Sequence, residues 1–139
     1  MPLTAIPRHS VACCLGRELT APGHAREQAR KALFGWGLGE HAEDADLIIS
    51  ELVTNAIRHG AGPVIIGISY DSGHLRIEVH DDGPGRPIRH QATPDSECWR
   101  GLAVIDGLIE PYRGTLGVMD DGAGGGKTVY VSMCVTGGQ

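Results

Sequence analysis

The sequence predicts an α/β two-layer sandwich in which helices cover one face of a mixed, mostly antiparallel β-sheet. Three observations support this fold class. Two amphipathic helical patterns precede a hairpin pattern, a long irregular loop follows the hairpin, and one more helix and two strands end the chain. Long helices ahead of a run of strands are typical of helices packed against a sheet. The 139 residues contain no repeat or linker, so one domain over 1–139 is expected, with its core at about 8–135.

The first half of the chain is expected to hold one strand and two helices. Residues 11–15 are a short apolar run that predicts the strand. Residues 24–36 place alanine and leucine at helical spacing, which predicts the first helix. Residues 40–59 carry the strongest helical pattern, because apolar side chains recur every three or four positions. Gly60 follows directly, in the position where glycine commonly ends a helix.

The second half is expected to begin with a β-hairpin. Residues 64–70 and 75–80 alternate apolar and polar side chains on either side of Asp71-Ser72-Gly73, a turn sequence. Residues 83–99 contain three prolines and no hydrophobic periodicity, so a long loop is expected, with 86–99 as a lid over a ligand. The remaining expected elements are one helix and two strands, at residues 102–109, 114–119 and 128–135.

The composition argues against several classes of function. The net charge is −5, and 21% of the residues are charged, which does not favour general binding to nucleic acid or to a membrane surface. The four cysteines form no C-x-x-C pair, and the seven histidines show no zinc-ligand spacing, so reduced thiols and no zinc site are expected. No stretch approaches eighteen apolar residues, which predicts a soluble, cytoplasmic protein.

One stripe of the 40–59 helix carries candidate catalytic and metal-binding residues. Glu51 and Asn55 lie one turn apart, next to Thr54 and Arg58. A solvent-facing polar stripe is the plain interpretation, and it fits most amphipathic helices. Asparagine is, however, unfavourable inside a helix, because its amide competes for backbone hydrogen bonds. Magnesium ligation would explain it, since hard cations bind amide and carboxylate oxygens, so Asn55 is a candidate ligand and Glu51 a candidate base.

An acidic, glycine-rich turn follows the second hairpin strand. Asp81, Gly83 and Gly85 come directly after an alternating apolar run. An ordinary β-turn is one interpretation of this sequence. The functional interpretation is that Asp81 accepts a hydrogen bond from a purine amino group, while the glycines allow backbone to approach the ligand.

Two further segments are candidates for ligand contact. Lys127 and Thr128 follow a run of glycines, but no P-loop is present, because Asp121 stands where its first glycine is required and a strand follows. Contact with a ligand from the start of that strand, or a plain hairpin turn, are both open. Arg100-Gly101-Leu102 lies where the long loop meets a helix, so its N–H groups would favour a phosphate unless this is a simple junction.

Taken together, these motifs resemble those of the GHKL superfamily of ATPase domains, which includes gyrase, a heat-shock chaperone, histidine kinases and a mismatch-repair ATPase. Residues 50–60 resemble its N box, and residues 79–85 resemble its first glycine box. The resemblance implies a Bergerat ATP-binding fold with ATP and Mg²⁺ as cofactors. It also implies Glu51 as general base, Asn55 as the magnesium ligand and Asp81 as the residue on the adenine.

Two weaker motifs extend the resemblance over essentially the whole chain. Arg100-Gly101-Leu102 resembles the second glycine box, with Cys98 and Trp99 in place of the glycines that usually introduce it. Residues 126–128 resemble the last box, which implies that Thr128 lies near the hydrogen-bond network on the adenine side.

Length and layout further resemble the stand-alone anti-sigma-factor serine/threonine kinases of the superfamily. This resemblance implies a regulatory serine/threonine protein kinase that acts on a protein partner, either an anti-anti-sigma-like substrate or a sigma factor. A homodimer is one of the assembly states that it allows. The alternative is a non-catalytic module that binds ATP, or has lost the ability to bind it, and sequesters a transcription-regulatory partner without phosphoryl transfer.

Overall fold

The computed structural model describes residues 8–83, 97–121 and 125–136, with the backbone alone described for 97–101. The strands are β1 (His9–Leu15), β2 (Val64–Asp71), β3 (His74–Asp81), β4 (Thr115–Asp120) and β5 (Lys127–Cys134). The helices are α1 (Ala21–Gly35), α2 (Ala42–His59) and α3 (Glu97–Ile109), with short 3₁₀ turns η1 (Gly39–His41) and η3 (Glu110–Tyr112).

The sheet has the strand order β1-β2-β3-β5-β4. All four pairings of the described strands are antiparallel, so the sheet lacks the parallel pair that a mixed sheet would contain. The crossover from β3 through α3 to β4 leaves a gap in the order, which β5 fills when it returns from β4. As a result, the ends of β3 and β5 are direct neighbours although they lie far apart in the sequence.

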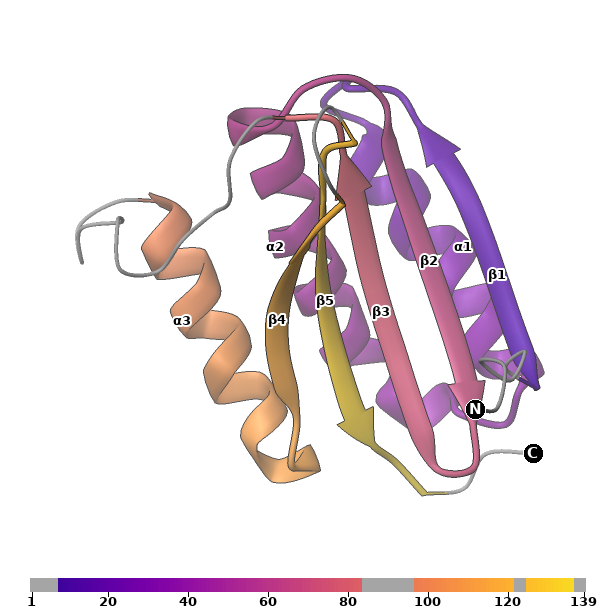
Figure 1. Ribbon diagram of the computed structural model, residues 1–139. Coiled ribbons are helices and arrows are strands. Elements are labelled where there is room, and N and C mark those ends of the chain that lie inside the picture. Colours follow the sequence, from indigo (N-terminus) through magenta and orange to yellow (C-terminus); the bar gives the residue numbers. More distant parts are fainter. Residues whose placement is uncertain (1–7, 84–96, 122–124, 137–139) are drawn as a thin grey trace, which may run out of the picture.

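Two layers are visible in Figure 1, where α1 and α2 lie behind the sheet and α3 lies beside β4. The alternation of β2 and β3 buries every second side chain on the helix side, as the period of two requires. Each fully buried Ile, Leu or Val stabilises the fold by about 1.5–3 kcal/mol relative to exposure. The core where α2 meets β3 consists of Ile48, Ile49, Leu52, Val53, Leu75, Ile77 and Val79.

The helix α2 is stabilised by charge at both ends as well as by its apolar stripe. Glu43 and Asp44 lie in its first turn and Arg58 and His59 in its last turn, so both pairs oppose the helix dipole favourably. The hairpin between β2 and β3 has a loop of two residues, Ser72 and Gly73, whose φ angles are 50° and 84°. Positive φ at both positions is the geometry of a type I′ turn. The hairpin that the sequence predicts is therefore present.

Each expected helix and strand is present, and the main difference concerns α3. The helix begins at Glu97, five residues before the predicted 102–109, so its first turn takes up the end of the segment expected to be a loop. Most of the expected loop over 83–99, including Gly85, lies outside the described residues. No helix in the described part of the chain is both long and apolar enough to cross a membrane.

Candidate functional site

A buried ion pair joins the ends of β3 and β5. Asp81 is the last residue of β3, Lys127 is the first of β5, and the two are direct partners in the antiparallel ladder. Nζ of Lys127 lies 2.8 Å from Oδ1 of Asp81, and the two side chains are only 7% and 2% exposed. Asp81 continues the inward-facing row of β3, so the pair lies on the helix side of the sheet. A cation and hydrogen-bond donors offset the hydration that such a side chain loses in the interior.

The two oxygens of Asp81 have different surroundings. Oδ1 accepts hydrogen bonds from the backbone N–H of Gly83 at 2.7 Å and of Ala61 at 3.4 Å, in addition to Lys127. Among the residues that the structure describes, no donor contacts Oδ2. One oxygen is therefore fully used by the protein, while the other remains able to accept a hydrogen bond from a ligand.

Three glycines surround this ion pair so closely that no side chain would fit. A Cβ atom on Gly60 would lie 2.4 Å from Oδ1 of Asp81, and one on Gly83 would lie 2.7 Å from the same oxygen. Gly126 has φ of +83°, and its Cβ would lie 2.2 Å from the backbone oxygen of Asp81. Backbone thus approaches Asp81 closely at three positions, while the predicted approach of backbone to a ligand stays a prediction.

The polar stripe of α2 belongs to the helix layer, which packs on the face of the sheet that carries the Asp81 side chain. Glu51 and Asn55 are half-buried and one turn apart on α2, which packs against β3. Gly60, directly after α2, touches the Asp81 carboxylate, so the end of the helix and the end of β3 meet. The structure thus brings the two strongest predicted motifs to neighbouring elements.

Arg17 holds the end of α2 in place, and the sequence analysis missed it. Its guanidinium donates hydrogen bonds to the backbone oxygens of Ile57, Gly60 and Gly62, the last two at 3.1 Å. The segment that it holds also accepts a hydrogen bond at Ala61 O from the N–H of Asp82, at 2.8 Å. Arg17 is forty or more residues from these partners in the sequence, so no local pattern marks it.

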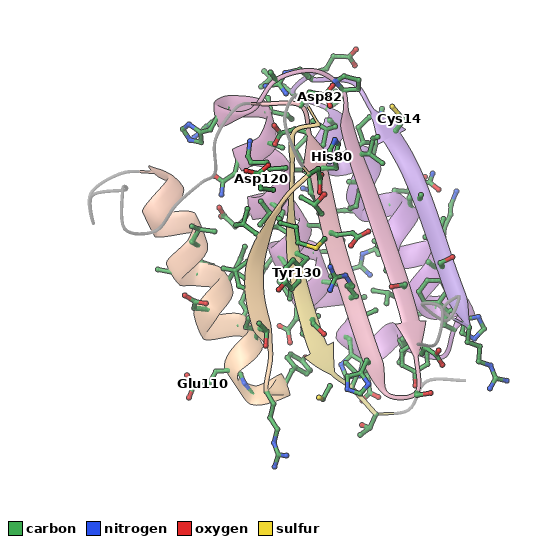
Figure 2. The ribbon with its side chains drawn as sticks, in the orientation of Figure 1. Cys14, His80, Asp82, Glu110, Asp120 and Tyr130 are labelled. Carbon is green, nitrogen blue, oxygen red and sulfur yellow. The ribbon has the colours of Figure 1, made fainter. Side chains whose placement is uncertain are left out.

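Thr128 is not the ladder partner of Asp81, and its expected place near the adenine-side hydrogen-bond network stays a prediction. Its ladder partner is His80, on the opposite face of the sheet from Asp81. There Thr128 Oγ1 donates to Oδ2 of Asp121 at 2.9 Å, and His80 Nδ1 lies 2.8 Å from the same oxygen. Figure 2 shows His80, Asp82 and Asp120 gathered at that end of the sheet. Lys127, one residue earlier, occupies the position next to Asp81.

The residues of the second glycine box fall inside α3 rather than at its start. Because the helix begins at Glu97, the N–H groups of Gly101 and Leu102 lie beyond the first four and are used within the helix. Arg100 lies within the first four residues of the helix, and the expected contact of this segment with a phosphate stays a prediction. Leu102 itself is buried, and the backbone of Arg100 is helical.

The described residues fit a nucleotide better than a protein-enclosed metal. Oδ2 of Asp81 is a buried acceptor of the kind that an amino group on a base requires. No group of three or more His, Cys, Asp or Glu in the described residues could hold a metal ion. A magnesium ion at Asn55 would therefore take most of its ligands from phosphates and water, which is its usual behaviour in nucleotide sites.

This fold and site define an ATPase-type domain, and comparison with known proteins identifies the family. The model described as "Histidine kinase-, DNA gyrase B-, and HSP90-like ATPase" matches residues 40–136. The match covers more than half of the chain and includes α2, β3 and β5, which carry the site. The chain belongs to this family, the GHKL ATPases, whose members bind ATP.

Histidine kinases are prominent among the similar proteins. The chain is 28% identical over 108 residues to the sensor histidine kinase CpxA of Escherichia coli, covering 68% of this chain and 24% of CpxA. The chain thus spans about a quarter of that relative. The properties of the whole relative do not transfer with so short a match.

Solved structures of histidine kinases share the fold. The histidine kinase domain of the Escherichia coli osmosensor EnvZ has a TM-score of 0.53 and 19% identity, covering 95% of this chain and 91% of that domain. The histidine kinase domain of a blue-light-activated histidine kinase from Erythrobacter litoralis has a TM-score of 0.55 and 21% identity. The match covers 84% of this chain and 60% of that domain's chain. These structures confirm the predicted fold class, the helix-covered sheet of the Bergerat fold.

Proposed function

We propose that this chain binds ATP together with Mg²⁺ and transfers the terminal phosphoryl group to a serine or threonine hydroxyl of a protein partner. The observation that carries the proposal is the buried carboxylate of Asp81, which keeps one oxygen available at the end of β3. The neighbouring helix α2 adds a carboxylate and an amide one turn apart. The family match supports the nucleotide, since it covers all of these elements.

Each residue has a distinct role in this proposal. Oδ2 of Asp81 accepts a hydrogen bond from the amino group of adenine, and the amide oxygen of Asn55 holds the metal ion. When bound, Mg·ATP supplies the phosphoryl group and neutralises the charge that develops on the phosphates. Glu51 accepts the proton of the partner hydroxyl. The hydroxyl oxygen forms its bond to the terminal phosphorus while the bond between that phosphorus and ADP breaks. Positioning and electrostatics carry most of the rate in such transfers.

The choice of acceptor rests on resemblance rather than on the similar proteins found. CpxA is a histidine kinase by name, and a histidine acceptor is the competing possibility. The serine/threonine acceptor follows from the likeness in layout to anti-sigma-factor kinases over about residues 8–135. From the same likeness we infer the partner, which is an anti-anti-sigma-like protein or a sigma factor.

A second candidate function is a binding module that sequesters the partner without phosphoryl transfer. The observation that favours it is the ion pair itself, because Lys127 already neutralises the carboxylate that would bind adenine. In that case the ammonium of Lys127 takes the place of adenine as the partner of Asp81. Partner capture would then be unaffected by nucleotide.

Incubation of the full chain and a candidate partner with γ-labelled ATP and Mg²⁺ separates these possibilities. The proposal expects label on the partner that resists acid, as phosphoserine and phosphothreonine do. Label that acid removes but alkali leaves would indicate a phosphohistidine and overturn the proposed acceptor. Partner capture with no transfer would support the binding module.

A further inference from the structure

We propose that Lys127 is a second base-reading residue of the nucleotide site, whose ammonium donates a hydrogen bond to the ring nitrogen at position 1 of adenine. Asp81 would at the same time accept from the adjacent 6-amino group. The inference rests on the proposed ATP site and adds to it a residue that determines specificity.

The first observation is that both members of the buried pair have unused hydrogen-bonding capacity. A lysine ammonium has three N–H donors, and within the described residues only Oδ1 of Asp81 accepts from Lys127, at 2.8 Å. Oδ2 of Asp81 likewise has no donor among those residues. Both side chains are more than nine-tenths buried, and buried polar atoms are normally satisfied. The pair therefore presents an acceptor beside a donor to whatever enters the site.

The second observation is that the backbone of Gly83, without a side chain, lies directly against the pair. A Cβ atom there would lie 2.7 Å from Oδ1 of Asp81 and 3.0 Å from Nζ of Lys127, so any side chain would occupy the space against the pair. Glycine at this position therefore adds no side chain to the space beside the two charged atoms.

The chemistry of the pair matches one purine edge and opposes another. Adenine presents an amino donor at position 6 next to a ring acceptor at position 1, which complements a carboxylate next to an ammonium. Hypoxanthine and guanine present the reverse, a carbonyl acceptor at position 6 and an N–H donor at position 1. Placed in the same orientation, they would set the carbonyl against Asp81 and the N–H against Lys127. Two contacts instead of one would therefore select adenine.

Thr128 cannot take this role, because it lies on the other face of the sheet with His80. Of the two polar residues that begin β5, only Lys127 faces the same side as Asp81. This placement is why the inference concerns Lys127 and not its neighbour.

Calorimetric titration of the full chain with ATP and with 1-deaza-ATP, both with Mg²⁺, tests the inference directly. The analogue replaces the ring nitrogen at position 1 by a C–H group and keeps the 6-amino group. The protein should bind it about tenfold or more weakly than ATP, since a hydrogen bond from a charged donor is lost. In Lys127→Met the two ligands should bind with affinities within about twofold of each other. The exposed Lys31→Met is the matched control and should keep the parent ratio.

Equal binding of ATP and 1-deaza-ATP by the parent protein would overturn the inference while leaving the ATP site intact. Failure of the parent to bind ATP would instead overturn the proposed function. If Lys127→Met does not fold, the comparison of ATP with 1-deaza-ATP in the parent protein decides alone. The parent ratio needs no variant, so the test remains decisive in either case.

Discussion

Lys127 and Asp81 face each other across the β3–β5 ladder with 2.8 Å between Nζ and Oδ1, and each compensates the buried charge of the other. Removing one member leaves the other as an uncompensated ion in the interior, which typically costs about 3–5 kcal/mol. The stability of the domain and the proposed contact with nucleotide thus depend on the same two side chains.

A double-mutant cycle measures this coupling. We expect Lys127→Met and Asp81→Asn each to lower the free energy of unfolding by about 3–5 kcal/mol, and the double variant to recover most of the loss. Urea denaturation with circular dichroism provides the measurement. Lys31→Met, which removes an exposed partner of Glu27, should change stability by about 0.5 kcal/mol or less. Additive losses in the double variant would show that the two residues do not compensate each other.

Asn55→Ala should reduce the dependence of ATP binding on magnesium. The substitution removes the amide oxygen and leaves the metal ion to phosphates and water. Titrations with ATP in Mg²⁺ and in EDTA give the measurement, and we expect the ratio of the two affinities to approach one in the variant. Thr54→Ala, beside it on α2, serves as the control and should keep the parent ratio. Identical Mg·ATP affinity in Asn55→Ala and the parent would exclude Asn55 as a ligand.

Glu51→Ala should separate binding from chemistry. Adenine, metal and phosphate contacts remain, so nucleotide affinity should change little, while phosphoryl transfer should fall by about 10²–10⁴, the usual effect of losing a general base. Single-turnover transfer from γ-labelled ATP to the partner measures the rate. The matched control is Glu27→Ala, on the exposed surface of α1. Transfer that continues unchanged in Glu51→Ala would rule out the catalytic role without touching the ATP site.

Gly60→Ala and Gly107→Ala should have opposite effects on stability. A Cβ at Gly60 would lie 2.4 Å from Oδ1 of Asp81, whereas one at Gly107 in α3 meets nothing within 4 Å. We expect Gly60→Ala to destabilise the domain by about 1–3 kcal/mol, because the ion pair must shift. Gly107→Ala should stabilise it by about 1 kcal/mol through helix propensity. Thermal unfolding of both variants measures the two changes in stability. An unchanged stability in Gly60→Ala would show that the backbone at this position moves away from Asp81 at little cost in free energy.

Stability should fall at alkaline pH because of Tyr112. Burial and a hydrogen bond to Asp44 raise its pKa from 10.0 to about 12. The folded state therefore keeps a proton that the unfolded state releases, so the contribution is complete below pH 10 and disappears as pH approaches 12. Tyr112→Phe should lose about 1 kcal/mol at neutral pH and show a shallower decline between pH 10 and 12. Urea unfolding across this range tests it, and parallel pH profiles for the two proteins would contradict the assignment.

The fold was predictable because its elements follow two simple periods. Alternation over β2 and β3 and the apolar stripe of α2 are visible in the sequence, and the same patterns bury the core. Asp81, Glu51 and Asn55 were also accessible, since a turn sequence and helical spacing mark them locally. Their functional roles remain predictions.

The geometry that joins distant segments was not predictable. Whether Lys127 or Thr128 meets Asp81 depends on the register between β3 and β5, and a shift of one residue would exchange them. No sequence pattern fixes that register across 46 positions. The early start of α3 at Glu97 was missed for a different reason, because residues 83–99, with three prolines, were interpreted as one long loop.

The three carbonyls held by Arg17 have a consequence for how far this domain can be shortened. The segment shared with the wider family starts at residue 40, so a fragment trimmed to it would lack Arg17 together with β1 and α1. The oxygens of Gly60 and Gly62 would then turn to water, and Ala61 would no longer be held with its N–H toward Asp81. The smallest fragment that keeps the Asp81 carboxylate in place is therefore longer than the family match over residues 40–136. It extends back to β1.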